Sequence, residues 1–178
     1  QQFKHFDKTE HNNPERSYSL FDLIHKDQCL RNTHQIWFCP SRKAAENLSV
    51  ALRRNTHARK HYAALNVSSE ECSNDAAETS KAVERFINDA EKEDKKAIIL
   101  SVGKLKRGNT LKKIGTAVML DNGESYENWF QAVCRAKSYR DGKDFCFIVD
   151  FNPTRSFVMM WQFAESIAKS QNQDLNED

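Results

Sequence analysis

The sequence predicts a three-layer α/β/α domain built on a mainly parallel β-sheet of five or six strands. Short continuous apolar runs, typical of strands covered on both faces, alternate along the chain with segments whose apolar residues recur at helical spacing. This alternation favours parallel strands joined by right-handed helical crossovers. With 178 residues, 39% of them hydrophobic, the chain is long enough to form one domain with a real core.

The first half of the domain is predicted to contain two strands, each followed by a helix. The first strand is the apolar run 35–39 (QIWFC), which Pro40 ends. Ser41 is a suitable N-cap for the next helix, because apolar residues recur at helical spacing from there to residue 54. The second strand is 61–67 (HYAALNV), and an acidic, serine-rich loop separates it from a helix over 81–93.

The second half is predicted to contain three more strands. The apolar runs 97–102 (AIILSV) and 115–120 (GTAVML) are joined by a basic loop in which no helix is expected. A helix begins at Ser125, and a final strand over 144–151 leads into an amphipathic helix over 154–170. These two helices complete the predicted layers.

Three regions are predicted along the chain. Residues 1–30 form a polar, partly helical N-terminal segment, residues 31–169 form the domain, and residues 170–178 form a disordered tail. Because the first residue is Gln rather than Met, we expect the chain to be a fragment of a longer protein.

Composition limits the environment and the partners. The five cysteines show no C-x-x-C pairing and mostly lie in apolar runs, which favours a reduced, cytoplasmic location. No apolar run approaches the length of a membrane span, so no membrane partner is expected. The net charge is only +2, and any affinity for a polyanion must therefore come from a local patch.

Several common active-site motifs are not found in the sequence. No G-x-G-x-x-G follows the first strand and no G-x-x-x-x-G-K-[ST] is present, so the chain lacks the usual loops that bind nucleotide phosphates. No Ser-His-Asp or Cys-His arrangement stands out. His57 and His61 could share a helical face as metal ligands, but no carboxylate or cysteine lies near them at metal spacing. We therefore predict no metal site.

Polar and basic segments follow the carboxyl ends of the predicted strands, where open α/β sheets bind their ligands. These segments are Pro40–Ser41, 66–69, 101–109 and 121–125. The third runs into the basic stretch GKLKRGNTLKK at 103–113. A basic loop in isolation is most often only a solvated loop, so its neighbours must decide whether it binds a ligand.

The helix that begins at Ser125 carries a predicted buried stripe. The stripe consists of Tyr126, Trp129, Phe130, Val133 and Cys134. Gln131 and Arg135 lie one turn apart and off this stripe. A rigid helix can present such an amide and guanidinium to a phosphate bound by a second domain, although an ordinary exposed polar row has the same pattern.

Two segments of the sequence resemble the second RecA-like domain of superfamily 2 helicases and translocases, most closely those of restriction enzymes and related phage or mobile-element proteins. SVGKLKRGNT and the following AVML are similar to "T-V-G-x-L-T-x-G-x-T" and "V-x-M-L" of the family. SYENWFQAVCR is similar to "S-x-x-x-Y-x-Q-A-x-x-R". The architecture is similar over about residues 35–151, but only these two segments are motif-specific. The resemblance implies a RecA-like, P-loop-NTPase-type fold without its own P-loop.

The first segment corresponds to motif V of the family, which contacts nucleic-acid phosphate and couples it to the nucleotide. Ser101 stands at the position of the family's threonine. Gly108 and Asn109 lie in the glycine-containing turn of this motif, and the resemblance implies that they contact the nucleotide. Pro40 and Ser41 resemble motif IV, in which a further phosphate contact is expected. The implied partner is DNA, contacted through its backbone and not through its sequence, and the basic residues of the loop belong to the same expected interface: Lys104, Lys106 and Arg107.

The second segment corresponds to motif VI. Gln131 matches its glutamine, and Arg135 matches its arginine finger, which reaches the γ-phosphate of ATP across an interdomain cleft. The resemblance implies ATP with Mg²⁺ as the cofactor, held by a first RecA-like domain of the same polypeptide to which residues 1–30 would be the linker. The domain alone is expected neither to bind a cofactor nor to hydrolyse ATP.

The sequence departs from motif VI at two positions. Cys134 replaces the usual glycine before the arginine, and Ser138 replaces a second arginine. Lys137 and Arg140 are the candidates to supply that second cation.

Two other interpretations fit the same residues. The first is a standalone Rossmann-like module that binds nucleic acid or a protein partner without ATPase activity. The second is an α/β domain whose basic loop has no specific role. A Walker A segment and a D-E-x-x box in the parent protein would distinguish the helicase interpretation from both.

Overall fold

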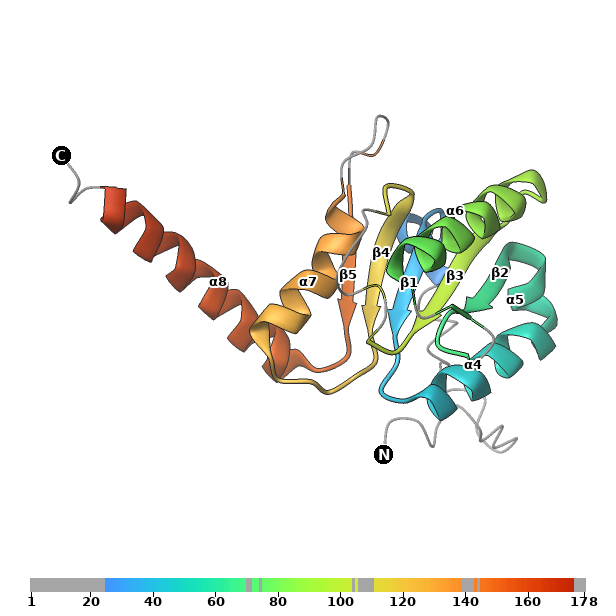
Figure 1. The fold of residues 1–178 in the computed structure, drawn as a ribbon, viewed down its shortest axis with the longest axis horizontal. Helices are drawn as coiled ribbons and strands as arrows, with labels where there is room; N and C mark the ends of the chain where they lie inside the picture. The colour runs from blue at the N-terminus through green and yellow to red at the C-terminus, as the bar shows by residue number, and fades with distance from the viewer. Residues whose placement is uncertain are drawn as a thin grey trace.

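Five parallel strands form the central sheet of the part of the protein that the structure describes (Figure 1). The computed structural model describes residues 25–69, 72–73, 75–103, 105, 111–138, 143 and 145–174. The strand order is β2-β3-β1-β4-β5, and every pairing is parallel. The strands are β1 (His34–Phe38), β2 (Tyr62–Asn66), β3 (Lys96–Ser101), β4 (Ile114–Met119) and β5 (Phe147–Asp150). The predicted α/β class with a mainly parallel sheet is confirmed.

Helices cover both faces of the sheet and complete the three layers. One face packs against α3, α4 and α5, and the other packs against α6 and α7. The helices are α3 (Gln28–Arg31), α4 (Arg42–Arg54), α5 (Thr56–His61), α6 (Ala76–Lys92), α7 (Tyr126–Lys137) and α8 (Pro153–Asp174). Between β3 and β4 no helix occurs among the described residues, and residues 104 and 106–110 of this connection lie outside them.

The central strand β1 contributes to the core on both faces of the sheet. Ile36 and Phe38 point into the cluster under α6 and α7, whereas Trp37 and Cys39 point into the cluster under α4 and α5. This alternation follows from the two-residue period of a strand. Fully burying a side chain of this size contributes about 1.5–3 kcal/mol, so β1 is a main source of the stability that holds both helical layers.

Polar side chains set the starts of the helices. Ser41, Asp75 and Ser125 cap α4, α6 and α7, because an oxygen of each side chain accepts a hydrogen bond from the third following backbone N–H at 3.1, 2.8 and 3.3 Å. The cap at Asp75 places the start of α6 at Ala76, five residues before the predicted start. The polar residues Thr79 and Ser80 fit inside this helix because each hydroxyl donates to a backbone carbonyl one turn earlier.

A short helix, α5, occupies residues that the sequence pattern assigns to no helix. Asn55 caps it by accepting a hydrogen bond from Ala58 N at 2.9 Å, and Ala58 is fully buried under the sheet. The helix ends at His61, the residue with which the second strand is predicted to begin, so β2 starts one residue later.

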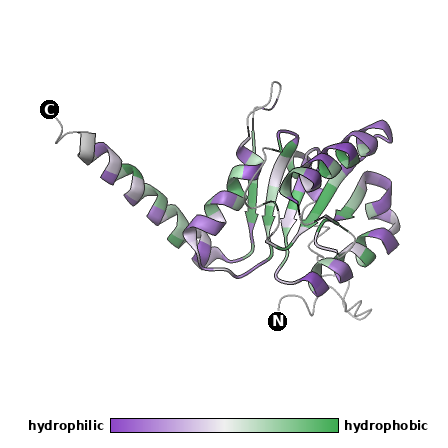
Figure 2. Ribbon diagram, viewed as in Figure 1, coloured by the Kyte–Doolittle hydropathy of each residue, from purple (hydrophilic) through white to green (hydrophobic). Residues whose placement is uncertain are grey.

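The last helix, α8, extends away from the sheet (Figure 1). Its apolar residues are largely exposed; Trp161 is 62% exposed, and Figure 2 shows the hydrophobic residues along the helix. No helix among the described residues is both long and apolar enough to cross a membrane. α8 continues to Asp174, whereas the disordered tail is predicted from residue 170, because no glycine or proline interrupts the helix after Pro153.

The buried His34 is expected to make the stability of the domain depend on pH. Its Nδ1 accepts a hydrogen bond from Ala97 N at 2.9 Å, and its Nε2 lies 3.1 Å from Glu91 Oε1. Burial lowers the pKa of His34, with the charges of Lys96 and Lys113 acting in the same direction against the hydrogen bond to Glu91. Protonation would also place a second N–H against the Ala97 donor.

The unfolded chain therefore binds the His34 proton more tightly than the folded domain does. The stability that the neutral, buried His34 contributes is complete above the ordinary histidine pKa of 6.5. It is lost as the pH falls from that value toward the lower pKa of His34 in the folded domain. We expect the free energy of unfolding, measured in urea between pH 7.5 and 5, to fall by up to about 1.4 kcal/mol per pH unit for this one proton. In His34→Gln this slope should be reduced; an unchanged slope would contradict the assignment.

Candidate functional site

The predicted ligand surface lies along the carboxyl edge of the sheet, where the ends of three central strands are joined by hydrogen bonds. Cys39 N donates to Ser101 O at 2.8 Å, which joins the end of β1 to β3. Leu120 N donates to Phe38 O at 2.9 Å, which joins β4 to β1. Burial and the nearby Asp121 raise the pKa of the Cys39 thiol to about 12, so this cysteine is an inert core residue.

Pro40 and Ser41 follow β1 on this edge and are both exposed. The Ser41 hydroxyl oxygen accepts a hydrogen bond from Ala44 N at 3.1 Å, as an N-cap does. The backbone here is therefore fixed, and a phosphate could approach it from solvent at the start of α4.

The turn after β2 supports the neighbouring turn after β3. Ser68 N donates to Asn66 Oδ1 at 3.0 Å, and the Ser68 hydroxyl accepts a hydrogen bond from Val102 N at 2.6 Å. Ser68 is buried, so this contact is shielded from water. The start of the basic loop, just after β3, is thus held in place by the turn that follows β2.

The basic loop is anchored at both ends by buried leucines. Leu105 and Leu111 are 6% and 1% exposed. Gly103 (φ 70°) and Leu105 (φ 64°) have the left-handed backbone that lets the chain turn sharply after β3. Five residues of the predicted site lie outside the described residues, and they stay predictions: Lys104, Lys106, Arg107, Gly108 and Asn109.

Ser101 lies at the end of β3, where the resemblance places a nucleic-acid contact. It is fully buried, because β3 is paired on both sides and covered on both faces. Its side chain is not exposed on the carboxyl edge, so it offers no surface to a ligand in this structure.

The buried face of α7 differs from the predicted stripe. Ala132, Val133 and Ala136 are buried, whereas Tyr126 and Phe130 are only half-buried. The small alanines let the helix approach β4 closely. The aromatic rings lie to the side instead: Phe130 stacks on Tyr126 at 5.7 Å and on Phe163 of α8 at 5.8 Å, measured between ring centroids.

Gln131 and Arg135 lie on the opposite side of α7 from the buried Val133, and both are half-buried. Burial lowers the pKa of Arg135, but arginine stays protonated in proteins, so its charge is retained. Arg135 is in the last turn of α7, about 15 Å along the helix from Ser125 at the carboxyl edge. The structure therefore separates Arg135 from the strand ends instead of bringing them together.

The C-terminal end of α7 is held by Lys143. Its Nζ donates to the carbonyl oxygens of Ile114 at 2.6 Å and Ser138 at 2.8 Å, and also to that of Ala136. Ser138, at the position of the second motif VI arginine, donates its hydroxyl to Cys134 O at 3.4 Å. Of the two candidates for the second cation, Lys137 is exposed and Arg140 lies outside the described residues.

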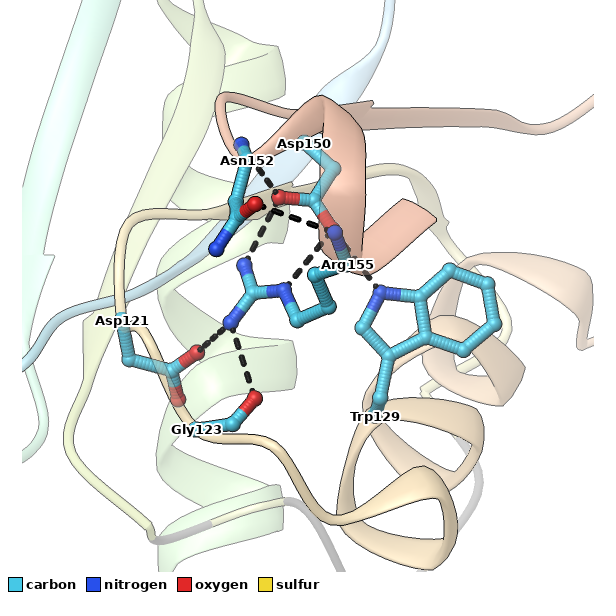
Figure 3. A network of polar contacts seen from close by, with 6 residues as sticks. All are labelled: Asp121, Gly123, Trp129, Asp150, Asn152 and Arg155. Carbon is cyan, nitrogen blue, oxygen red and sulfur yellow. Dashed lines mark hydrogen bonds and ion pairs between the residues drawn. The ribbon is translucent and has the colours of Figure 1, made fainter. Parts of the chain in front are cut away.

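A buried ion-pair network, which sequence reasoning missed, joins the loop after β4, the end of β5, α7 and α8 (Figure 3). Arg155 donates through Nη2 to Asp150 Oδ1 at 2.7 Å, through Nε to Asp150 Oδ2 at 3.0 Å, and through Nη1 to Asp121 Oδ1 at 3.0 Å. It also reaches the Gly123 carbonyl at 3.2 Å, while Trp129 Nε1 donates to Asp150 Oδ2 at 3.0 Å.

The network fixes charge at the carboxyl edge. The side chains of Arg155 and Asp150 are 3% and 4% exposed. Burial acts to raise the pKa of Asp150, but hydrogen bonds from Arg155, Asn152 and Trp129 and the Arg155 charge lower it overall. The sequence pattern that could have indicated this network is Asp150 at the end of an apolar strand, followed by Asn152-Pro153 and by Arg155 at the start of the next helix.

Comparison with known proteins identifies the fold. No protein-family model matches the sequence, and no curated protein matches it either. Among solved structures, the ATP-dependent Type ISP restriction-modification enzyme LlaBIII bound to DNA matches with a TM-score of 0.54 and 19% identity, over 66% of this chain. The C-terminal part of the Fun30 ATPase domain matches with a TM-score of 0.50 and 16% identity, over 74% of this chain. The domain has the RecA-like fold of C-terminal helicase domains.

This RecA-like domain spans 8% of the length of the LlaBIII chain and 38% of the Fun30 chain. The C-terminal domain of the DEAD-box protein Dbp5 also matches, with a TM-score of 0.48 and 17% identity, over 77% of this chain and 71% of that one.

Proposed function

We propose that this chain is the C-terminal motor domain of an ATP-dependent DNA helicase or translocase. The observation that carries the proposal is the RecA-like sheet in which α7 follows β4 and holds Gln131 and Arg135 on the side opposite Val133. In this function, the domain contributes backbone contacts to DNA from its carboxyl edge, and it contributes the Arg135 guanidinium to ATP held by a first RecA-like domain.

Nucleotide binding in this proposal needs a second domain. The chain has no G-x-x-x-x-G-K-[ST] loop, so its own residues do not fit a phosphate-cradling site. ATP supplies the phosphoryl group whose transfer drives translocation. Arg135 would approach that group from α7, and Gln131, one turn earlier on the same side, would help to orient it.

DNA contact is proposed for the exposed Pro40–Ser41 turn and for the basic loop that Leu105 and Leu111 anchor. The two segments follow β1 and β3, which are adjacent in the sheet, so they emerge side by side. The LlaBIII enzyme was solved with DNA bound, which supports DNA as the partner. Lysine and arginine contacts to phosphates confer affinity without sequence specificity.

DNA binding by the domain is expected to be weak, to depend strongly on salt, and to require Lys104, Lys106 and Arg107. Replacing all three with alanine should weaken binding of a labelled single-stranded oligonucleotide. It should also reduce the slope of log K against log salt by about 0.7 for each phosphate that the variant no longer neutralises, about 2 in all. Fluorescence anisotropy at several salt concentrations measures both quantities.

A triple variant of equal charge provides the control. Three exposed arginines lie away from the carboxyl edge, near the amino ends of the strands. They are Arg53 and Arg54 in the last turn of α4, and Arg59 in α5. Changing these three residues to alanine removes the same net charge but should change the salt slope little. Equal affinity in the loop variant and the wild type would contradict the proposed interface.

A further inference from the structure

Two histidines of α5 and a third that is distant in the sequence lie close together in the structure. His57 and His61 lie one turn apart on this helix, and His25 lies just before α3. One ring nitrogen from each residue lies within 4.8 Å of the others. The ring centroid of His25 is 4.4 Å from that of His57 and 4.8 Å from that of His61. In the sequence, His57 and His61 have no third candidate ligand near them, but folding brings His25 beside them.

The helix that carries two of these rings is held firmly. The Asn55 side chain caps its start, Tyr62 N donates to Ala58 O at its end, and Ala58 between them is fully buried. The rings at the i and i+4 positions therefore project from one fixed turn, the spacing by which a helix presents two ligands to one ion. The Tyr62 ring, with its centroid 6.0 Å from that of His25, flanks the third.

We propose that His25, His57 and His61 form a site for a divalent transition-metal ion, with Zn²⁺ as the expected occupant. Three neutral imidazoles suit zinc, copper, nickel or cobalt, whereas Mg²⁺ and Ca²⁺ need oxygen ligands. Zinc–nitrogen bonds of about 2.0–2.1 Å in tetrahedral geometry place the nitrogens about 3.3 Å apart, so the rings must close by up to about 1.5 Å. The fourth position would be taken by water.

The charges around the cluster limit the affinity of the site. Burial lowers the pKa of His61, and so do the charges of His57, Lys60 and Arg31, which favours the neutral ring that a metal requires. The charges of Lys60 and Arg31 also repel a metal ion. We therefore expect binding weaker than that of a structural zinc site with thiolate ligands.

The role of such a site is structural. It would connect the chain before α3 to α5. Both segments lie near β2, which is the edge strand of the sheet on the side opposite β5. It lies on the face of the sheet opposite α7, so its test does not depend on the role proposed for Arg135.

The test is a zinc titration of the chain without an affinity tag, after treatment with a chelator. Isothermal titration calorimetry should give one Zn²⁺ per chain, and thermal unfolding should move to higher temperature as Zn²⁺ is added. With Co²⁺, the visible absorption should show the intense bands of a four-coordinate site. No binding of Zn²⁺ below millimolar concentrations would overturn the proposal.

Matched variants locate the site. His57 is exposed, so His57→Ala should leave the far-UV circular dichroism unchanged, while Zn²⁺ affinity falls at least about tenfold, the minimum loss seen when even an outer-shell partner of a metal is removed. Lys60→Ala, on the same helix, should bind Zn²⁺ as tightly as the wild type or more tightly, because it removes a repelling charge. If His57→Ala binds with wild-type affinity, the proposal is wrong; His57→Gln provides the same comparison with a larger side chain.

Discussion

Replacing Arg155 with alanine is expected to destabilise the domain by about 3–5 kcal/mol, because it leaves Asp150 as a buried carboxylate without its ion-pair partner. The Asp150 side chain is only 4% exposed, and Arg155 supplies two of its hydrogen bonds. Asp121 and the Gly123 carbonyl each lose a hydrogen bond from Arg155 as well. The loss is a large part of the 5–15 kcal/mol that stabilises a typical domain. Urea unfolding followed by circular dichroism measures it.

Two variants control for general effects of removing a charge. Lys43→Ala breaks an exposed pair with Glu46 on α4 and should change stability little. Asp150→Asn combined with Arg155→Met removes both members of the most deeply buried pair and should cost less than Arg155→Ala alone, because only Asp121, which is more exposed, keeps an uncompensated charge. If Arg155→Ala is as stable as Lys43→Ala, the network does not support the fold.

The network also predicts how the domain responds to acid. Because the folded-state pKa of Asp150 lies below its ordinary value of 3.8, its contribution is complete above that pH and is lost as the pH falls through the folded pKa. This loss occurs at lower pH than the loss from His34, which begins at 6.5. The two contributions can therefore be separated in one pH series.

Most of the fold follows from local sequence patterns. The continuous apolar runs of β1, β3 and β4 are strands covered on both faces, and their burial confirms this. Ser41 and Ser125 cap helices in the structure as they are predicted to do. A cap is visible in sequence because it depends only on a polar residue three positions before a helical N–H.

What the sequence does not predict depends on tertiary contacts. The sequence pattern predicts that the large apolar residues of α7 form its buried face. In the structure the small residues Ala132 and Ala136 pack against the sheet, because they allow the helix to approach it more closely. Arg155 and Asp121 are 34 residues apart, and His25 and His57 are 32 apart, so no periodic pattern links either pair. Sequence reasoning locates α7, but it did not show that Arg135, in the last turn of this helix, lies about 15 Å along the helix from the carboxyl edge.

Arg135→Ala is expected to lower ATP turnover by about a thousandfold or more, the range seen for arginine fingers, in a protein that carries both motor domains. The effect should fall on turnover, with much less change in ATP affinity, because the guanidinium would act only when the two domains close around ATP. Arg135→Lys should restore little, since an ammonium group cannot reproduce the planar fork of the guanidinium. The measurement is steady-state ATPase activity with and without DNA, at saturating ATP.

The position of Arg135 makes this test specific to its proposed role. The face of α7 that packs against β4 is formed by other residues, Ala132, Val133 and Ala136, so the variant should fold, which circular dichroism checks. Arg53→Ala, an exposed arginine at the end of α4 on the other face of the sheet, is the matched control and should keep wild-type turnover. If Arg135→Ala folds and retains DNA-stimulated turnover close to that of Arg53→Ala, Arg135 is not an arginine finger. A loss of DNA binding in the Lys104, Lys106 and Arg107 variant would still be informative in that case, because it reports on the carboxyl edge and not on α7.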